Sequence, residues 1–155
     1  MRPLQTLLIS LALLGAAAPT LAADTPNVRT AKRVLLEKMG EGRFEKLDEI
    51  YGPGFVAHGS TGDFTLEEDN ESGRAWRRAF PDLKVTVERT AASEDLVAVH
   101  WRATGTNTGK DAGMPGLGDK ADVQGMTFFR FNKDGRIVEE WSLMDIATLM
   151  TQLGQ

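Results

Sequence analysis

The segment Gly135-Arg136-Ile137-Val138-Glu139-Glu140-Trp141-Ser142-Leu143-Met144-Asp145 carries the pattern that decides the fold. It follows a hairpin-type turn at Lys133-Asp134-Gly135 and is typical of a strand that stops before a helix. Side chains of equal parity share one face of a strand, so Trp141, Leu143 and Asp145 are predicted to point the same way. A carboxylate that shares a surface with apolar groups can have its pKa raised by desolvation, as a general base requires. Asp145 is therefore a candidate acid/base residue.

Asp145 also has a structural interpretation. It directly precedes the apolar stretch Ile146-Ala147-Thr148-Leu149-Met150. Aspartate is a favoured residue at a helix N-cap, where its side chain accepts a hydrogen bond from a backbone N–H of the first turn. The two roles are compatible, and the residues alone leave both open.

The rest of the chain predicts helices first and a sheet afterwards. Apolar residues recur at helical spacing over 27–39, around 44–50 and over 66–80, and Pro81 ends the third helix. A brief strand is expected over 55–58. After Pro81 the period changes to two, which predicts strands around 85–87, over 97–104, over about 120–132 and through Trp141, with a last helix over 146–153. This order indicates an α+β fold, with N-terminal helices packed on a curved, mostly antiparallel sheet and a cavity between them.

The first 23 residues are predicted to be a secretory signal peptide. Arg2 is the only charge before Asp24, Leu7 to Ala18 is apolar, and small residues follow Pro19. The alternative is an uncleaved membrane anchor, although a span needs roughly 20 apolar residues. Cleavage after Ala23 would leave residues 24–155 as a single domain, periplasmic or secreted, with no membrane contact in the mature form.

The composition disfavours two classes of partner. The formal net charge is −4, and no basic stripe is present, so nucleic acid is not an expected partner. The chain has no cysteine, and its two histidines, His58 and His100, lie far apart in sequence. We therefore expect neither a metal site nor disulfides.

Several motifs occur together in a fixed order. They are Phe80-Pro81-Asp82-Leu83, Leu96 to Trp101, Gly105-Thr106-Asn107-Thr108-Gly109, the loop with Gly113-Met114-Pro115 and Gly118, Val123 to Phe131, and Asp134 to Trp141 followed by Asp145. In this order and spacing the chain resembles the SnoaL-like polyketide cyclases, or ester cyclases, of the NTF2-like superfamily. The resemblance covers about residues 28–155.

The resemblance implies a cone-shaped α+β barrel, often a homodimer, with a deep apolar pocket. Characterised members close a polyketide ring by intramolecular aldol condensation without a metal or an organic cofactor. Their acid/base aspartate matches Asp145, and His58 matches a histidine that many members carry near the pocket. Asn107 and Glu140 stand where some relatives have histidine.

An aldol closure needs a base and a donor that holds the enolate oxygen. We expect Asp145 as the base and His58, Asn107 or a water as the donor. The apolar wall is expected to include Trp76, Trp101, Met114, Met126, Phe128 and Trp141. Structural alternatives remain for all of them: His58 as a hydrogen-bonded strand residue, the tryptophans as core, and Met114 with Leu117 as a plain loop or as a lid. Glu139 and Glu140 point to opposite faces, and one of them can reach the pocket or lie on its rim.

Three functions fit these features. The first is acid/base chemistry on a small, largely apolar carbonyl compound, in a cyclisation, isomerisation or lyase reaction. The second is non-catalytic capture of a small molecule by the same fold, which export favours. The third is an interaction domain whose pocket is filled by side chains.

Overall fold

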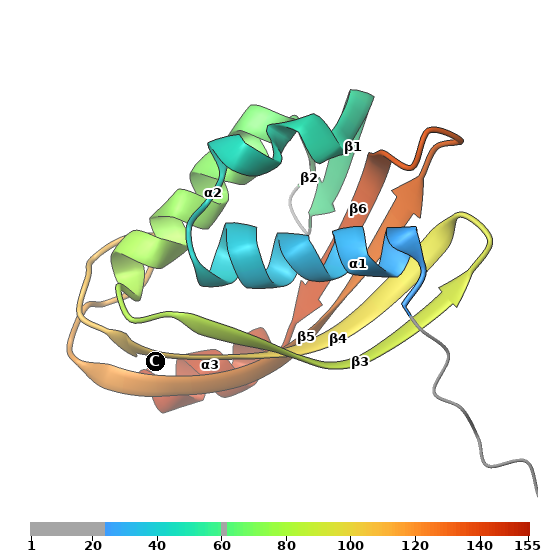
Figure 1. Cartoon of the computed structure of the whole chain (residues 1–155). Helices are drawn as coiled ribbons and strands as arrows, with labels where there is room; N and C mark the ends of the chain where they lie inside the picture. Colours follow the sequence, from blue (N-terminus) through green and yellow to red (C-terminus); the bar gives the residue numbers. More distant parts are fainter. Residues whose placement is uncertain (1–23, 60–61) are drawn as a thin grey trace, which may run out of the picture.

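The computed structural model describes residues 24–59 and 62–155 (Figure 1). In chain order the elements are α1 (Pro26–Arg33), η1 (Val34–Gly40), η2 (Glu45–Ile50), β1 (Tyr51–Gly59), β2 (Gly62–Phe64), α2 (Leu66–Ala79), β3 (Lys84–Ser93), β4 (Leu96–Asn107), β5 (Asp119–Phe131), β6 (Ile137–Met144) and α3 (Ile146–Gln152). The predicted α+β class is confirmed. The predicted signal peptide, residues 1–23, lies outside the described residues.

One curved sheet of six strands forms the body of the fold, in the order β2-β1-β6-β5-β4-β3. The pairings are antiparallel except that of β1 with β6, which is parallel. Strands β2 and β3 are the two edges, so the sheet is open and does not close into a barrel. The predicted sheet is thus confirmed as mostly antiparallel, with one parallel pair and the short β2 added to it.

Helices cover one face of this sheet. Figure 1 shows α1 crossing the strands, with α2 beside it. Thr25 caps the N-terminus of α1. The buried side of α1, which includes Val28 and Ala31, packs in one cluster with Val97, Val99 and Phe129 of the sheet. Burial of each valine or phenylalanine side chain in this cluster contributes roughly 1.5–3 kcal/mol. A capping box between Thr65 and Glu68 fixes the start of α2.

The predicted helix 27–39 is present but changes its winding. It is α-helical to Arg33 and π-helical from Val34 to Gly40. Short π-helical segments are rare and occur frequently at functional sites. This segment holds Lys38, which is only 1% exposed. The π-helical segment thus carries a buried lysine.

A bulge in β6 decides which of its side chains face the helices. Arg130 pairs with Glu139 but Phe131 pairs with Ile137, so Val138 is an extra residue. One extra residue reverses the side-chain alternation beyond it. Ile137 and Glu140 are both buried, whereas Leu143 is 71% exposed. After the bulge, the even-numbered residues of β6 therefore face the helices.

Within the two described ranges, no helix is long and apolar enough to cross a bilayer.

Candidate functional site

Asp145 is the N-cap of α3 and is exposed to solvent. The backbone N–H of Thr148 donates to Asp145 Oδ1 over 3.0 Å, and the Thr148 hydroxyl donates to Oδ2 over 2.7 Å. These hydrogen bonds favour the charged form and lower the pKa of the Asp145 carboxyl. The predicted desolvation and raised pKa are therefore wrong, and the alternative of a helix cap is confirmed. The physical reason is the bulge at Val138, which leaves Trp141 and Leu143 on the outer face of the sheet.

His58 lies on the outer face of the sheet, next to Trp141. The two rings stack with centroids 4.8 Å apart and planes at 16°. His58 Nδ1 lies 2.8 Å from Asp63 Oδ1, and Nε2 lies 3.3 Å from Glu139 Oε1. The hydrogen bond with Asp63, assisted by that with Glu139, raises the pKa of His58. Both ring nitrogens are thus engaged with carboxylates that do not belong to the inner face.

The other residues predicted to form the pocket wall are spread over the fold. Trp101 is in the main core, Trp76 stacks on Phe80, Met114 belongs to a second core cluster, Met126 is 42% exposed, and Phe128 pairs with Trp141 across β5 and β6. Asn107 is fully buried and ties loop backbone together, because its amide donates to the carbonyls of Ala79 and Gly109 and its oxygen accepts from Gly116. None of these residues lines the cleft described next.

A cleft of about 140 Å³ lies between α2 and the C-terminal halves of β1 and β6. Its lining is Ala57, His58, Gly59, Phe64, Asp69, Ser72, Glu140 and Ser142. Asp69 and Ser72 are three residues apart on α2, so they lie on one side of that helix. The short strand β2 closes the cleft through Phe64, whose ring packs over Gly59. Of the predicted site residues, only His58 contributes to this lining, although its ring stacks on Trp141 on the outer face of the sheet.

Glu140 is the unusual group in this cleft. Its side chain is 9% exposed, and Oε1 accepts a hydrogen bond from the Ser142 hydroxyl over 3.1 Å. Oε2 is buried and has no hydrogen-bond partner among the described residues. Burial, with the nearby charge of Asp69, raises the pKa of Glu140 from 4.5 to about 7, against the opposing effect of Lys38. A carboxyl group with this pKa can give or take a proton at neutral pH.

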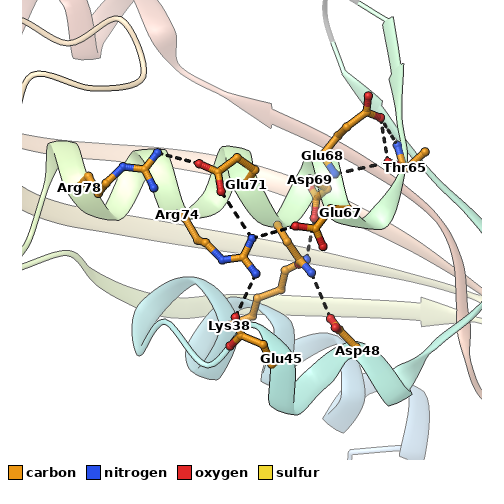
Figure 2. Close-up of polar contacts among 11 residues, drawn as sticks. Lys38, Glu45, Asp48, Thr65, Glu67, Glu68, Asp69, Glu71, Arg74 and Arg78 are labelled. Carbon is orange, nitrogen blue, oxygen red and sulfur yellow. Dashed lines mark hydrogen bonds and ion pairs between the residues drawn. The ribbon is translucent and has the colours of Figure 1, made fainter.

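Lys38 and Asp69 form a partly buried ion pair beside Glu140. Lys38 Nζ lies 2.6 Å from Asp69 Oδ2 and also donates to the Tyr51 hydroxyl over 3.0 Å. Figure 2 shows Lys38 reaching from η1 to Asp69 on α2. Burial, with the charges of Glu140, Asp69 and Asp48, raises the pKa of Tyr51. The cleft thus holds one carboxylate that is paired with a cation and one carboxyl group that is not.

A line of hydrogen bonds connects Glu140 to the core. Trp101 Nε1 donates to Thr127 Oγ1 over 2.9 Å, and the Thr127 and Ser142 hydroxyls lie 2.7 Å apart. Because Ser142 donates to Glu140, the Thr127 hydroxyl is the donor to Ser142. Every donor in this line points toward Glu140 Oε1. While Ser142 donates to Oε1, a proton carried by Glu140 sits on Oε2.

The sequence held weak signals for these residues. Lys38 continues the spacing of Ala31, Val34 and Leu35, so a lysine lies on an otherwise apolar helical stripe. A lysine at such a position is almost never buried unless it is paired. Glu140 was recognised only as one of two adjacent glutamates that could reach the pocket, because the bulge that turns it inward has no marker in the sequence.

A second hollow, of about 300 Å³, lies between α2 and the segment 42–45. It is lined by Gly42, Phe44, Glu45, Arg74, Arg77 and Arg78. The arginines are engaged: Figure 2 shows Arg74 and Arg78 bonded to neighbouring acids, and Arg77 donates to the carbonyls of Met39 and Gly40. Residues 24–59 and 62–155 contain no group of three or more potential metal ligands.

The profile of the SnoaL-like polyketide cyclase family matches residues 29–153. Among solved structures, a protein from Jannaschia sp. CCS1 that is assigned provisionally as a SnoaL-like polyketide cyclase is 28% identical, with a TM-score of 0.76 over 88% of this chain and 97% of that one. IdmH from Streptomyces antibioticus, provisionally a polyketide cyclase, is 27% identical, with a TM-score of 0.71 over 83% and 99%.

AclR from Streptomyces galilaeus, provisionally a hydroxylase, is 22% identical, with a TM-score of 0.73 over 83% of this chain and 95% of that one, and shares the fold. Among curated proteins, none matches the chain. The match to the family profile spans most of the chain and agrees with the NTF2-like fold of the structural neighbours. The chain therefore belongs to the SnoaL-like polyketide cyclase family.

Proposed function

We propose that the inner cleft binds a small carbonyl compound and that Glu140 transfers protons to and from it. The observation that carries this proposal is the buried Oε2 of Glu140, which faces no protein partner among the described residues while Oε1 is held by Ser142. A buried polar atom without a partner costs roughly 1–3 kcal/mol. A ligand oxygen or an acidic C–H placed against Oε2 would use the group that the protein leaves unpaired.

The pKa of Glu140, about 7, suits this role. The carboxylate form would remove a proton from the carbon beside the carbonyl, and the C–H electron pair would move into an enolate. The protonated form would then return that proton to carbon or oxygen. Proton return at another carbon gives an isomerisation, and attack of the enolate on a second carbonyl gives an aldol closure. Both use one acid/base group whose pKa lies near the working pH.

The size of the cleft limits the ligand. Pockets for drug-sized ligands are about 300–1,000 Å³, and an apolar cavity of about 150 Å³ holds benzene. A cleft of about 140 Å³ accommodates a compound of one ring or a short chain. We therefore expect a substrate smaller than a fused polycyclic polyketide.

Exchange of α-protons in D2O tests this proposal with a simple probe, cyclohexanone, followed by ¹H NMR. The wild-type protein should accelerate loss of the α-proton signal, and Glu140→Gln should lower the rate at least tenfold, since general acid/base groups contribute typically 10²–10⁴-fold. Asp145→Asn is the matched control and should retain the rate, because Asn caps a helix about as well as Asp. An exchange rate in Glu140→Gln equal to that of the wild type would refute proton transfer by this residue.

The second candidate function is capture of a small molecule without turnover. The apolar N-terminal run, which favours export, supports this function. Polyketides are assembled in the cytoplasm, so an exported protein would not meet a chain that awaits ring closure. It predicts that wild-type protein and Glu140→Gln bind cyclohexanone alike and that neither exchanges its protons.

Export and homodimer formation remain proposals. Cleavage after Ala23 would give a mature chain that begins at Asp24, which intact-mass measurement of the protein from a periplasmic extract or from the culture medium would reveal. Light scattering after size exclusion would measure the oligomeric state.

A further inference from the structure

Few charged groups lie around the cleft, and some of them already pair with a neighbouring charge. Asp69 and Glu140 are the carboxyl groups of its lining. Lys38 lies behind Asp69, within 2.6 Å of its carboxylate, and is 1% exposed. His58 is the one basic residue in the described lining, and its ring nitrogens are occupied by Asp63 and Glu139. A ligand in the cleft would therefore find carboxyl oxygens but no uncommitted cation.

We propose that the cleft selects uncharged ligands that accept a hydrogen bond, and that Asp69 is the residue that enforces this choice by holding Lys38. This inference rests on the proposed function for the place of the ligand. With Lys38 committed to Asp69, the pair is neutral as a whole. Glu140 then contributes either a neutral acid or a negative charge.

An anionic ligand is disfavoured in both states of Glu140. It would lie next to the Asp69 carboxylate in a partly desolvated site, where like charges are weakly screened. A neutral carbonyl oxygen avoids this repulsion and can accept the proton on Glu140 Oε2. A cationic ligand finds no uncommitted negative partner while Glu140 is protonated, which is its main form at pH 6, because a buried carboxyl group has to ionise to provide one.

Asp69 is the specificity determinant in this arrangement because its carboxylate balances the charge of Lys38, which its removal leaves unbalanced. In Asp69→Asn the ammonium of Lys38 loses the negative charge that lies 2.6 Å from it and keeps neutral acceptors such as the Tyr51 hydroxyl. The ammonium would then be available to an anion in the cleft. Ser72→Lys adds a cation by a different route, at an exposed position of α2 that lines the same cleft.

Three probes of equal shape separate charge from size: isobutyramide, isobutyrate and isobutyramidinium. Each is titrated at pH 6, where Glu140 is mostly protonated, and at constant ionic strength into ¹⁵N-labelled protein, and binding is read from the amide signals of the cleft residues. The wild type should bind isobutyramide at least tenfold more tightly than either ion. Asp69→Asn should reduce the preference for isobutyramide over isobutyrate at least fivefold. If Asp69→Asn fails to fold, Ser72→Lys should reduce the preference for isobutyramide over isobutyrate by the same factor.

The inference is wrong if the wild type binds isobutyrate or isobutyramidinium as tightly as isobutyramide, if isobutyramide leaves the cleft signals unchanged, or if the folded variants keep the wild-type preference. These titrations involve no turnover. Selectivity that persists in a protein without α-proton exchange would therefore refute the proposed catalysis and leave this inference standing, whereas exchange without selectivity would do the reverse.

Discussion

Ser142 Oγ donates a hydrogen bond to Glu140 Oε1 over 3.1 Å, and both residues lie on the inner face of β6. The bond orients a carboxyl group that is otherwise surrounded by the protein interior, and it leaves Oε2 free of protein partners within the described residues. The site that we propose is built on this relationship, since it determines which oxygen is available to a ligand.

Removal of the Ser142 hydroxyl should raise the pKa of Glu140 further. A hydrogen bond donated to a carboxylate favours the charged form, and Ser142 lowers the pKa of Glu140 in this way. In Ser142→Ala the pH midpoint of α-proton exchange should move up by about 0.5–1 pH unit. Ser93→Ala, at an exposed position of β3, serves as the matched control and should leave the midpoint in place. An unchanged midpoint in Ser142→Ala would show that the hydrogen bond does not tune Glu140.

Glu140→Gln should stabilise the protein at alkaline pH. The folded-state pKa of about 7 is above the ordinary value of 4.5, so the folded state holds a proton that the unfolded state has already released. Stability is therefore lost as pH rises from about 4.5 to about 7 and is constant above that interval. At about 1.4 kcal/mol per pH unit, the loss is about 3 kcal/mol.

Urea unfolding of both proteins at pH 4.5 and pH 8 measures this effect. The difference in free energy of unfolding between Glu140→Gln and wild type should shift in favour of the variant by about 3 kcal/mol between the two pH values. Contributions from titrating groups that do not interact with Glu140 cancel in this difference. A difference that stays constant with pH would mean that Glu140 titrates normally.

Lys38→Met should destabilise the fold because it leaves Asp69 without its cation. Loss of one partner from a buried ion pair costs about 3–5 kcal/mol, and the 25% exposure of the Asp69 side chain reduces this to about 2–3 kcal/mol. The double variant Lys38→Met/Asp69→Leu should recover most of the loss, since an apolar pair replaces the ionic one. Thermal unfolding of the two variants decides the matter, and equal destabilisation by both would show that the ion pair itself contributes little.

Gly125→Ala should disturb the Trp101 end of the hydrogen-bonded line. A Cβ at this position would overlap the indole ring of Trp101 and lie 2.7 Å from the carbonyl oxygen of Leu143. Overpacking of this kind typically costs about 1–3 kcal/mol. Gly40→Ala is the comparison, because a Cβ there meets its nearest atom at 3.4 Å. Similar chemical denaturation midpoints for the two variants would contradict the close packing of Trp101 on Gly125.

Much of the fold could be predicted from local patterns. The helix over 66–80, the alternation around Trp101 and the turn at Lys133-Asp134-Gly135 each depend on short-range periodicity or turn chemistry, and the structure contains all three. The parallel pairing of β1 with β6 could not be predicted in this way, because it joins segments about 80 residues apart and no short-range pattern marks it.

The site was harder to predict because it depends on one residue of register. Without the bulge at Val138, strict alternation would place Ile137, Glu139 and Trp141 on one face. The bulge instead turns Glu140 and Ser142 inward and leaves Trp141 against His58 on the outer face. Asp145 was singled out for its position after the strand, and its cap hydrogen bonds with Thr148 provide a complete structural explanation of it.

The most direct test is a ¹³C NMR titration of the side-chain carboxyl groups, with Glu140 and Asp145 assigned through Glu140→Gln and Asp145→Asn. The account predicts that Glu140 titrates with a pKa of about 7 and that Asp145 titrates below its ordinary value of 3.8. A Glu140 that titrates near 4.5, or an Asp145 with the raised pKa, would contradict the assignment of the proton-transfer group to the inner cleft.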